Sequence, residues 1–160
     1  MFDITLITVG KLKEKFYLSA AAEYEKRLKG YCQFKILELP EVRLPDSPSR
    51  AEITAGLEKE AEAILAKIPK GAWFCVLTPE GKLLSSEDLA AKMKDVKVSG
   101  KSSACFLIGS SFGIAPCVKS KADFQLSMSP MTFPHHLARI MVLEQIYRAE
   151  AIQAGSKYHK

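Results

Sequence analysis

The chain has 160 residues, of which 48% are hydrophobic and 26% are charged. This length suits one domain with a sizeable core, and this composition excludes a disordered chain. No apolar stretch is long enough to span a membrane, and Met1 leads directly into a strand-like run, so we expect neither a transmembrane helix nor a signal peptide. We therefore expect a cytoplasmic protein with a single domain over residues 1–160.

The charge balance is basic, with a formal net charge of +5 and a pI near 9.0. Residues 1–35 carry seven Lys or Arg against four acids, a net of +3, and the last four residues, KYHK, add basic and aromatic character. This balance suits a polyanionic partner, but it does not identify one by itself because many basic proteins bind no nucleic acid.

The cysteines and histidines do not predict a metal site. The four cysteines are widely spaced without a C-x-x-C pair, and three lie within or beside apolar runs, which is typical of reduced, buried thiols. His135 and His136 are adjacent, so on a helix they point about 100° apart and cannot easily share a metal ion. We expect no metal cofactor.

Strand-like and helix-like segments alternate along the chain. Apolar runs predict strands at residues 4–9, 34–39, 72–77, 104–109 and 124–128. Helical spacing predicts helices at 14–28 and about 53–68, one capped by Ser85 or Ser86, a short one near 115–121, and a last one with Pro134 in its first turn. The proline-rich segment 40–50 reads as a long loop, and TPEGK at 78–82 reads as a turn. The alternation predicts an open α/β sheet.

Three loops at predicted strand ends are the candidate ligand site, because ligands of such sheets bind beyond the carboxyl ends of the strands. They are LTPEGK, IGSSFG and SMSPMTFP, and each is rich in small residues, prolines or glycines. Gly109 and Gly113 either let the backbone approach a ligand or only shape a tight turn. No Walker loop, G-x-G-x-x-G fingerprint, nucleophile elbow or H-E-x-x-H motif is present.

The last helix, LARIMVLEQIYRA, is apolar around most of its circumference. Such a helix needs partners on both sides, so we expect the sheet on one side and a second subunit on the other. Glu144 and Arg148 are spaced i,i+4 and can pair on the helix. Arg139 has no acid at i±4, so we expect its guanidinium to be free to bind an anion.

Six segments resemble one known family: TVGKLKEKF, EYEKRL, LTPEGKLLSSEDLA, FLIGSSFG, LSMSPMTFPHHLARIMVLEQIYRA and the terminal YHK. They are similar to the bacterial ribosomal RNA large subunit methyltransferase H family, which belongs to the SPOUT group of trefoil-knotted methyltransferases. The resemblance covers the whole chain. It departs from the family at Ser110, where many relatives carry a second glycine, and at the second position of the His135–His136 pair, which varies. Because serine is small, we expect cofactor binding to survive the change at Ser110.

The resemblance implies a SPOUT-type parallel sheet flanked by helices, with a C-terminal trefoil knot, in a homodimer. It also implies methylation of a pseudouridine at N3 in 23S rRNA of the large ribosomal subunit, with S-adenosyl-L-methionine as the cofactor. The implied cofactor-binding positions are Leu77, Gly109, Met128, Ser129, Pro130, Met131, Thr132 and Phe133. On the substrate side, we expect Arg139 to stabilise an anionic base or grip phosphate and His135 to accept a proton. We expect Tyr158 and His159, on a flexible basic tail beside the site, to contact RNA.

Two other functions compete with this one. A non-catalytic RNA-binding or ribosome-associated factor would have kept the fold and lost the activity, which the intact strand-end loops disfavour. A small-molecule nucleotide-binding enzyme would leave the basic N-terminal third and the KYHK tail without a role.

Overall fold

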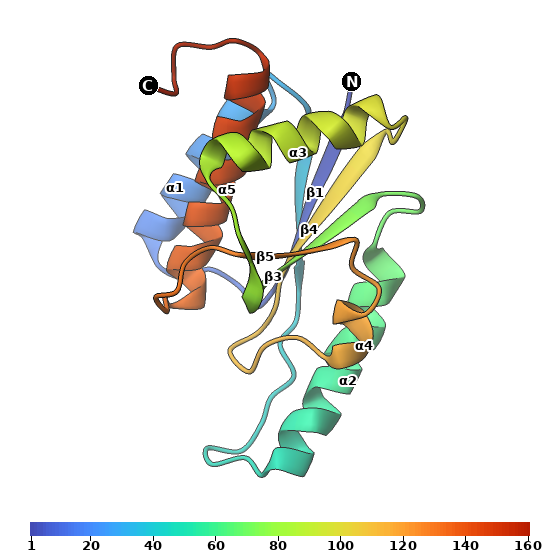
Figure 1. Cartoon of the computed structure of the whole chain (residues 1–160). Helices are drawn as coiled ribbons and strands as arrows, with labels where there is room; N and C mark the ends of the chain where they lie inside the picture. The colour runs from blue at the N-terminus through green and yellow to red at the C-terminus, as the bar shows by residue number, and fades with distance from the viewer.

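Five parallel strands form one sheet, in the order β2-β1-β4-β3-β5, in the computed structural model of residues 1–160 (Figure 1). The strands are β1 (Asp3–Val9), β2 (Gln33–Leu39), β3 (Trp73–Leu83), β4 (Ser103–Ile108) and β5 (Phe124–Ser127). The helices are α1 (Lys15–Leu28), α2 (Arg50–Lys67), α3 (Ser86–Val98), α4 (Pro116–Lys119) and α5 (His135–Gln153). Every neighbouring pair of strands is parallel, so all carboxyl ends reach the same edge of the sheet.

The predicted α/β alternation is confirmed, and the helix starts follow the expected capping chemistry. Ser85 caps α3 in a capping box with Asp88, and Ser49 caps α2 in the same way with Glu52. Pro134 is the N-cap of α5 rather than a residue of its first turn, because its backbone is extended, with φ −55° and ψ 142°. The prediction for Pro134 was therefore wrong by one position.

The predicted turn at residues 78–82 is also wrong, since β3 continues through it to Leu83. The strand shifts its register on β5 between Leu77 and Lys82. Gly81 makes this possible, because a Cβ at this position would lie 2.7 Å from the backbone of Gln125. Turn-forming residues here mark an irregular strand pressed against its neighbour, and a glycine inside a strand is a known sign of such close approach.

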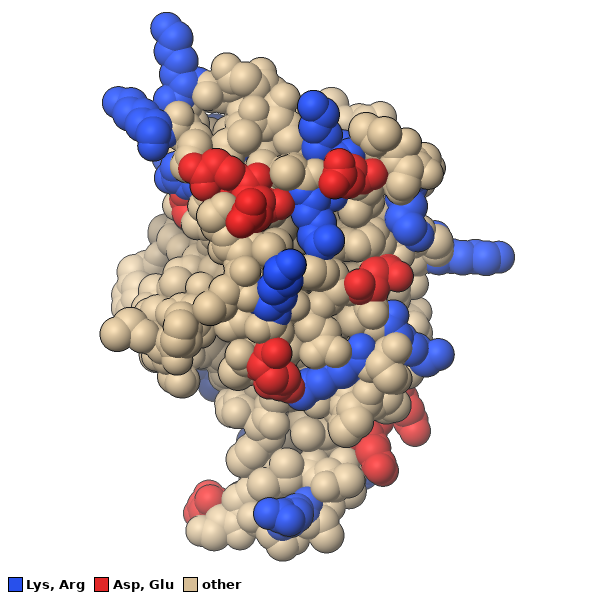
Figure 2. Space-filling model, viewed as in Figure 1, with Lys and Arg blue, Asp and Glu red and all other residues tan.

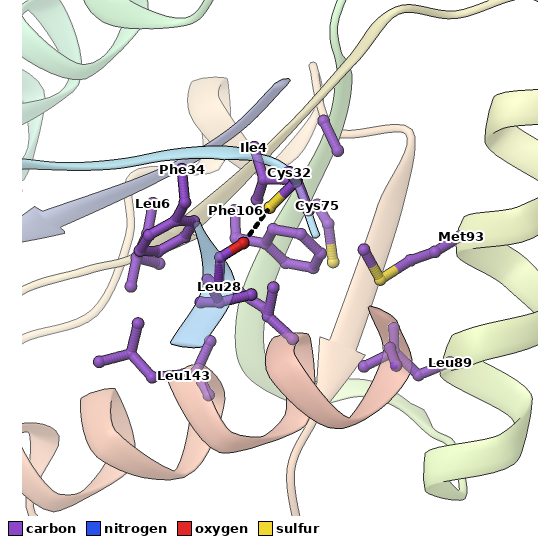
Figure 3. Close-up of a cluster of buried hydrophobic side chains, with 14 of the residues drawn as sticks. Ile4, Leu6, Leu28, Cys32, Phe34, Cys75, Leu89, Met93, Phe106 and Leu143 are labelled. Atoms are coloured by element: carbon purple, nitrogen blue, oxygen red, sulfur yellow. Dashed lines mark hydrogen bonds between the residues drawn. The ribbon is translucent and has the colours of Figure 1, made fainter. Parts of the chain in front are cut away.

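One face of the sheet packs against α1, α3 and α5 (Figures 1 and 3). Because side chains alternate along a strand, Ile4 and Leu6 of β1 point to this face, together with Phe106 of β4. Figure 3 shows these side chains meeting Leu143 of α5 and Met93 of α3. This packing covers α5 on the sheet side and along both flanks.

The other face packs against α2 and α4. The intervening positions of the strands, such as Ile7, Phe74 and Leu107, point to this side. Cys32, Cys75 and Cys105 are buried free thiols, as the apolar runs predicted, and burial raises the pKa of the Cys32 and Cys105 thiols to about 12. No helix combines the length and the apolar character that a membrane span requires.

Candidate active site

A cavity of about 820 Å³ lies at the carboxyl edge of the sheet, where the ends of β3, β4 and β5 meet. The three loops that the sequence singled out form its walls. The residues that line it include all eight of the predicted cofactor positions, namely Leu77, Gly109, Met128, Ser129, Pro130, Met131, Thr132 and Phe133. His135 and His136 also line it, whereas Arg139, Tyr158 and His159 do not.

The two glycines of the β4 loop shape a tight turn. Gly113 has a φ of +99°, a left-handed conformation that side chains disfavour. A Cβ on Gly109 would lie 2.5 Å from the carbonyl oxygen of Gly113 and from the side chain of Ile114. Glycine is thus required at 109 by the fold of the loop itself, whether or not a ligand approaches the same backbone.

The loop between β5 and α5 is held in shape by one serine. The Ser129 hydroxyl accepts a hydrogen bond from the Met131 backbone N–H at 3.0 Å, and the Ser129 carbonyl accepts one from the Ser127 hydroxyl at 3.2 Å. Pro130 and Pro134 restrict the backbone further. Met131 is 75% exposed, so this short loop presents both main chain and an apolar side chain to a ligand.

Ser110, the departure from the family pattern, has a partner that sequence reasoning did not identify. Its hydroxyl donates a hydrogen bond to the buried carboxylate of Glu60 on α2 at 2.8 Å. The second oxygen of Glu60 accepts the backbone N–H of Val42 at 2.9 Å. Glu60 therefore joins the cavity loop after β4 to the proline-rich segment 40–50. The sequence did not indicate this role for Glu60, because nothing in its spacing distinguishes it from the other acidic residues of α2.

Glu80 and Lys119 supply the only carboxylate and the only ammonium among the residues that line the cavity. They form an ion pair between the distal part of β3 and the end of α4. The hydrogen bond from Lys119 holds the pKa of the Glu80 carboxyl at about 2. Sequence reasoning missed both residues, since no local spacing connects them.

His135 stands at the start of α5, on the cavity wall. Its Nδ1 lies 3.4 Å from the Ser111 hydroxyl of the β4 loop. Partial burial lowers the pKa of His135, and the neighbouring His136 and Arg139 lower it further. The imidazole is therefore neutral at pH 7, the state in which it can accept a proton.

The expectation that Arg139 is free to bind an anion is wrong. Its side chain is buried, and its guanidinium pairs with Glu38 at the end of β2, at 2.7 Å. The same guanidinium donates to the backbone carbonyl of Gly10 at 2.9 Å. Arg139 lacks an acid at i±4, but its partner lies 101 residues away along the chain and only the fold brings it close.

The terminal tail, which we expected to be flexible, is held by side-chain contacts to α5 and α3. The Tyr158 hydroxyl donates to Glu144 at 2.9 Å, and the Tyr158 ring packs under the guanidinium of Arg148 at 4.6 Å. His159 lies 2.6 Å from Glu87 and 3.1 Å from Arg148. The predicted pairing of Glu144 with Arg148 is confirmed at 2.7 Å.

The tail cluster, Glu144, Arg148, Tyr158 and His159, lies outside the cavity of its own chain. Figure 1 shows the C-terminus at the end of the molecule where the strands begin, opposite the cavity loops. The tail folds back along α5, since Tyr158 contacts Glu144, and neither Tyr158 nor His159 is among the residues that line the cavity. One chain therefore brings His135 to the cavity and leaves Tyr158 and His159 elsewhere.

Comparison with known proteins agrees with this fold. The family described as "Predicted SPOUT methyltransferase" matches residues 2–159. A probable methylase family protein from Haemophilus influenzae Rd KW20 has the same fold, with a TM-score of 0.52 and 16% identity over 99% of this chain and 70% of that chain. The family match over nearly the whole chain, together with this fold, shows a methyltransferase of the SPOUT class.

Two relatives narrow the class. The ribosomal RNA large subunit methyltransferase H of Clostridium acetobutylicum is 46% identical over 158 residues, and that of Clostridioides difficile (strain 630) is 44% identical; each match covers 99% of both chains. The chain belongs to the ribosomal RNA large subunit methyltransferase H family.

Proposed function

We propose that this protein transfers a methyl group from S-adenosylmethionine to N3 of a pseudouridine in the 23S rRNA of the large ribosomal subunit. The observation that carries the proposal is the convergence of the three strand-end loops on one cavity, in a chain that matches methyltransferases of the large-subunit rRNA over almost its full length. The trefoil knot that the resemblance implies stays a prediction.

The residues that line the cavity fit this cofactor. Leu77, Met131 and Phe133 offer apolar cover, and the main chain of residues 128–133 offers N–H and C=O groups to an adenine edge. Glu80 and Lys119 carry charges opposite to the ammonium and carboxylate of the methionyl end. No three His, Cys, Asp or Glu side chains are grouped so that they could hold a metal ion.

The bound cofactor would supply a methyl group that its sulfonium already activates. The protein must then align the acceptor nitrogen with it and receive the proton that leaves N3. His135 suits the second task, because its imidazole faces the cavity and its lowered pKa keeps it neutral. Arg139 serves the same reaction from a buried position, through the backbone that it holds rather than by direct contact with the base.

We also propose that the enzyme works as a homodimer. Phe16 at the start of α1 is 66% exposed, and Leu137 at the start of α5 is 37% exposed. Tyr17, next to Phe16, packs edge-on against His136, next to Leu137, so the exposed side chains belong to one region beside the cavity. A two-fold partner covering this region could bring its own Tyr158 and His159 toward the cavity, which the tail of the same chain does not reach.

Isothermal titration and labelled methyl transfer test this function directly. S-adenosylmethionine is expected to bind in the presence of EDTA, and label from its methyl group is expected to enter large-subunit rRNA that lacks the modification. A protein that binds the cofactor but never labels rRNA, either free or in assembled subunits, would contradict the substrate. A protein that binds no cofactor would contradict the activity.

A further inference from the structure

The loop between β1 and α1 is fixed in place by contacts from two elements, α5 and β2. We call residues Gly10–Lys15, which end on the first residue of α1, the basic loop. Arg139 of α5 donates to the Gly10 carbonyl at 2.9 Å and pairs with Glu38 of β2 at 2.7 Å. The same oxygen of Glu38 also accepts the backbone N–H of Leu12 at 3.4 Å, and the Leu12 side chain is buried. The backbone of this loop is therefore held at two points around one buried arginine.

The lysines of the basic loop point outward and have no partners. Lys11, Lys13 and Lys15 are all exposed, and none takes part in any of the ion pairs of the molecule. Of the nearby acids, Glu38 binds Arg139 and Glu14 lies 3.7 Å from His136, while Glu41 approaches Gly10 without pairing with any of the three lysines. Three positive charges are thus displayed on a backbone held at two points, and no ion pair within the protein engages them.

Figure 2 shows basic and acidic side chains interspersed over the face that it displays, with no large patch of one sign. The net charge of +5 over 160 residues is modest, so we do not expect the overall field alone to hold a polyanion. A local, pre-positioned set of lysines is the more effective way to bind phosphates.

The basic loop lies beside the cavity. It leaves the carboxyl end of β1, and β1 pairs with β4 up to Thr8 and Ile108, directly before the β4 loop that forms one cavity wall. Glu14 of the basic loop approaches His136, which itself lines the cavity. Any nucleic acid that inserts a base into the cavity would run its backbone past this edge of the sheet.

We propose that the basic loop binds the phosphate backbone of the RNA substrate next to the target nucleotide, through Lys11, Lys13 and Lys15. This inference rests on the proposed function and names the surface that holds its substrate. Arg139 is then a positioning residue, because it fixes the loop that carries the lysines. Phosphate contacts of this kind set the register of the RNA on the protein and leave the choice of base to the cavity.

The test is the salt dependence of binding to large ribosomal subunits that lack the modification. We expect the triple variant Lys11→Gln, Lys13→Gln, Lys15→Gln to bind roughly 100-fold more weakly at 0.1 M salt and to lower the slope of log affinity against log salt by about 2, from three phosphate contacts at roughly 0.7–0.9 each. Its melting temperature and its affinity for S-adenosylmethionine should match those of the unaltered protein, since these side chains are exposed and do not line the cavity.

A matched control removes the same charge elsewhere. Lys59 and Lys67 on α2 and Lys94 on α3 are also exposed and unpaired, and their triple replacement by Gln should leave affinity within twofold and the slope unchanged. Equal effects of the two triples would mean that only net charge matters and would overturn the proposal, as would an unchanged slope in the loop variant. If the unaltered protein neither binds nor methylates these subunits, the proposed function itself fails, which is a distinguishable result.

Discussion

Replacing Arg139 by Met should destabilise the protein by about 2–3 kcal/mol. The change removes two charge-assisted hydrogen bonds, to Glu38 and to the Gly10 carbonyl, each contributing roughly 1.5 kcal/mol. The Glu38 side chain is 37% exposed, so water recovers part of the loss and the cost stays below the 3–5 kcal/mol typical of a fully buried broken pair. For a chain of this size, the melting temperature should fall by about 5–10 °C.

The assay is urea unfolding of Arg139→Met, Glu38→Gln and the double variant. If the ion pair between Arg139 and Glu38 causes the loss, the double-mutant cycle should give a coupling free energy of about 1 kcal/mol or more. As a control, Arg27→Met removes an exposed i,i+4 pair and should lower the free energy of unfolding by less than about 1 kcal/mol. Cofactor affinity of Arg139→Met should stay within a few-fold, and methyl transfer to RNA should drop strongly. Normal stability with abolished transfer would refute the positioning role and favour direct contact of Arg139 with the substrate.

Four further predictions follow from the same contacts. Gly109→Val should lower both the melting temperature and the affinity for S-adenosylmethionine, because a Cβ there would lie 2.5 Å from a backbone oxygen; unchanged affinity in a folded variant would exclude this loop from the site. Deletion of residues 157–160 should cost a few °C, leave cofactor affinity within a few-fold and strongly reduce methyl transfer; transfer at the unaltered rate would remove the tail from the reaction. The lowered pKa of Glu80 means that its contribution to stability is present above pH of about 4.5 and is lost as the pH falls toward about 2, so the stability difference from Glu80→Gln in urea melts should be larger at pH 5 than at pH 3. Leu137→Glu should shift light scattering from dimer to monomer, whereas a stable monomer of the unaltered protein at low micromolar concentration would rule out the dimer.

Much of the fold could be predicted from local patterns. Buried parallel strands read as continuous apolar runs, and the Ser85 capping box marks the start of α3 within one residue. The order of the strands could not be predicted, because parallel pairing depends on contacts between distant segments. The turn that we predicted after Leu77 was wrong because the outcome there also depends on a distant segment. Pro79 and Gly81 are typical of a turn, but in this fold they let β3 bend along β5.

The candidate site, too, has parts that the sequence predicts and parts that only the fold reveals. The three cavity loops could be predicted from small residues and prolines at the strand ends, together with the family resemblance. Each of these signals lies within a few residues of chain. The partners of Arg139 and His159 could not be found in that way, since Glu38 and Glu87 lie 101 and 72 residues away. Spacing rules for a helix consider only residues three or four positions apart on the same helix. They therefore predicted that Arg139 has no acidic partner, although the fold buries it against Glu38.

Nucleoside mass spectrometry of rRNA after incubation with S-adenosylmethionine tests the central claim most directly. Large-subunit rRNA that lacks the modification, free or in assembled subunits, is incubated with the protein and then digested to nucleosides. We expect one new methylated nucleoside, a pseudouridine carrying the methyl group at N3, and none when the Gly109→Val variant replaces the protein. Methylation at another position or on another base, or no methylation in either form of the rRNA, would contradict the account.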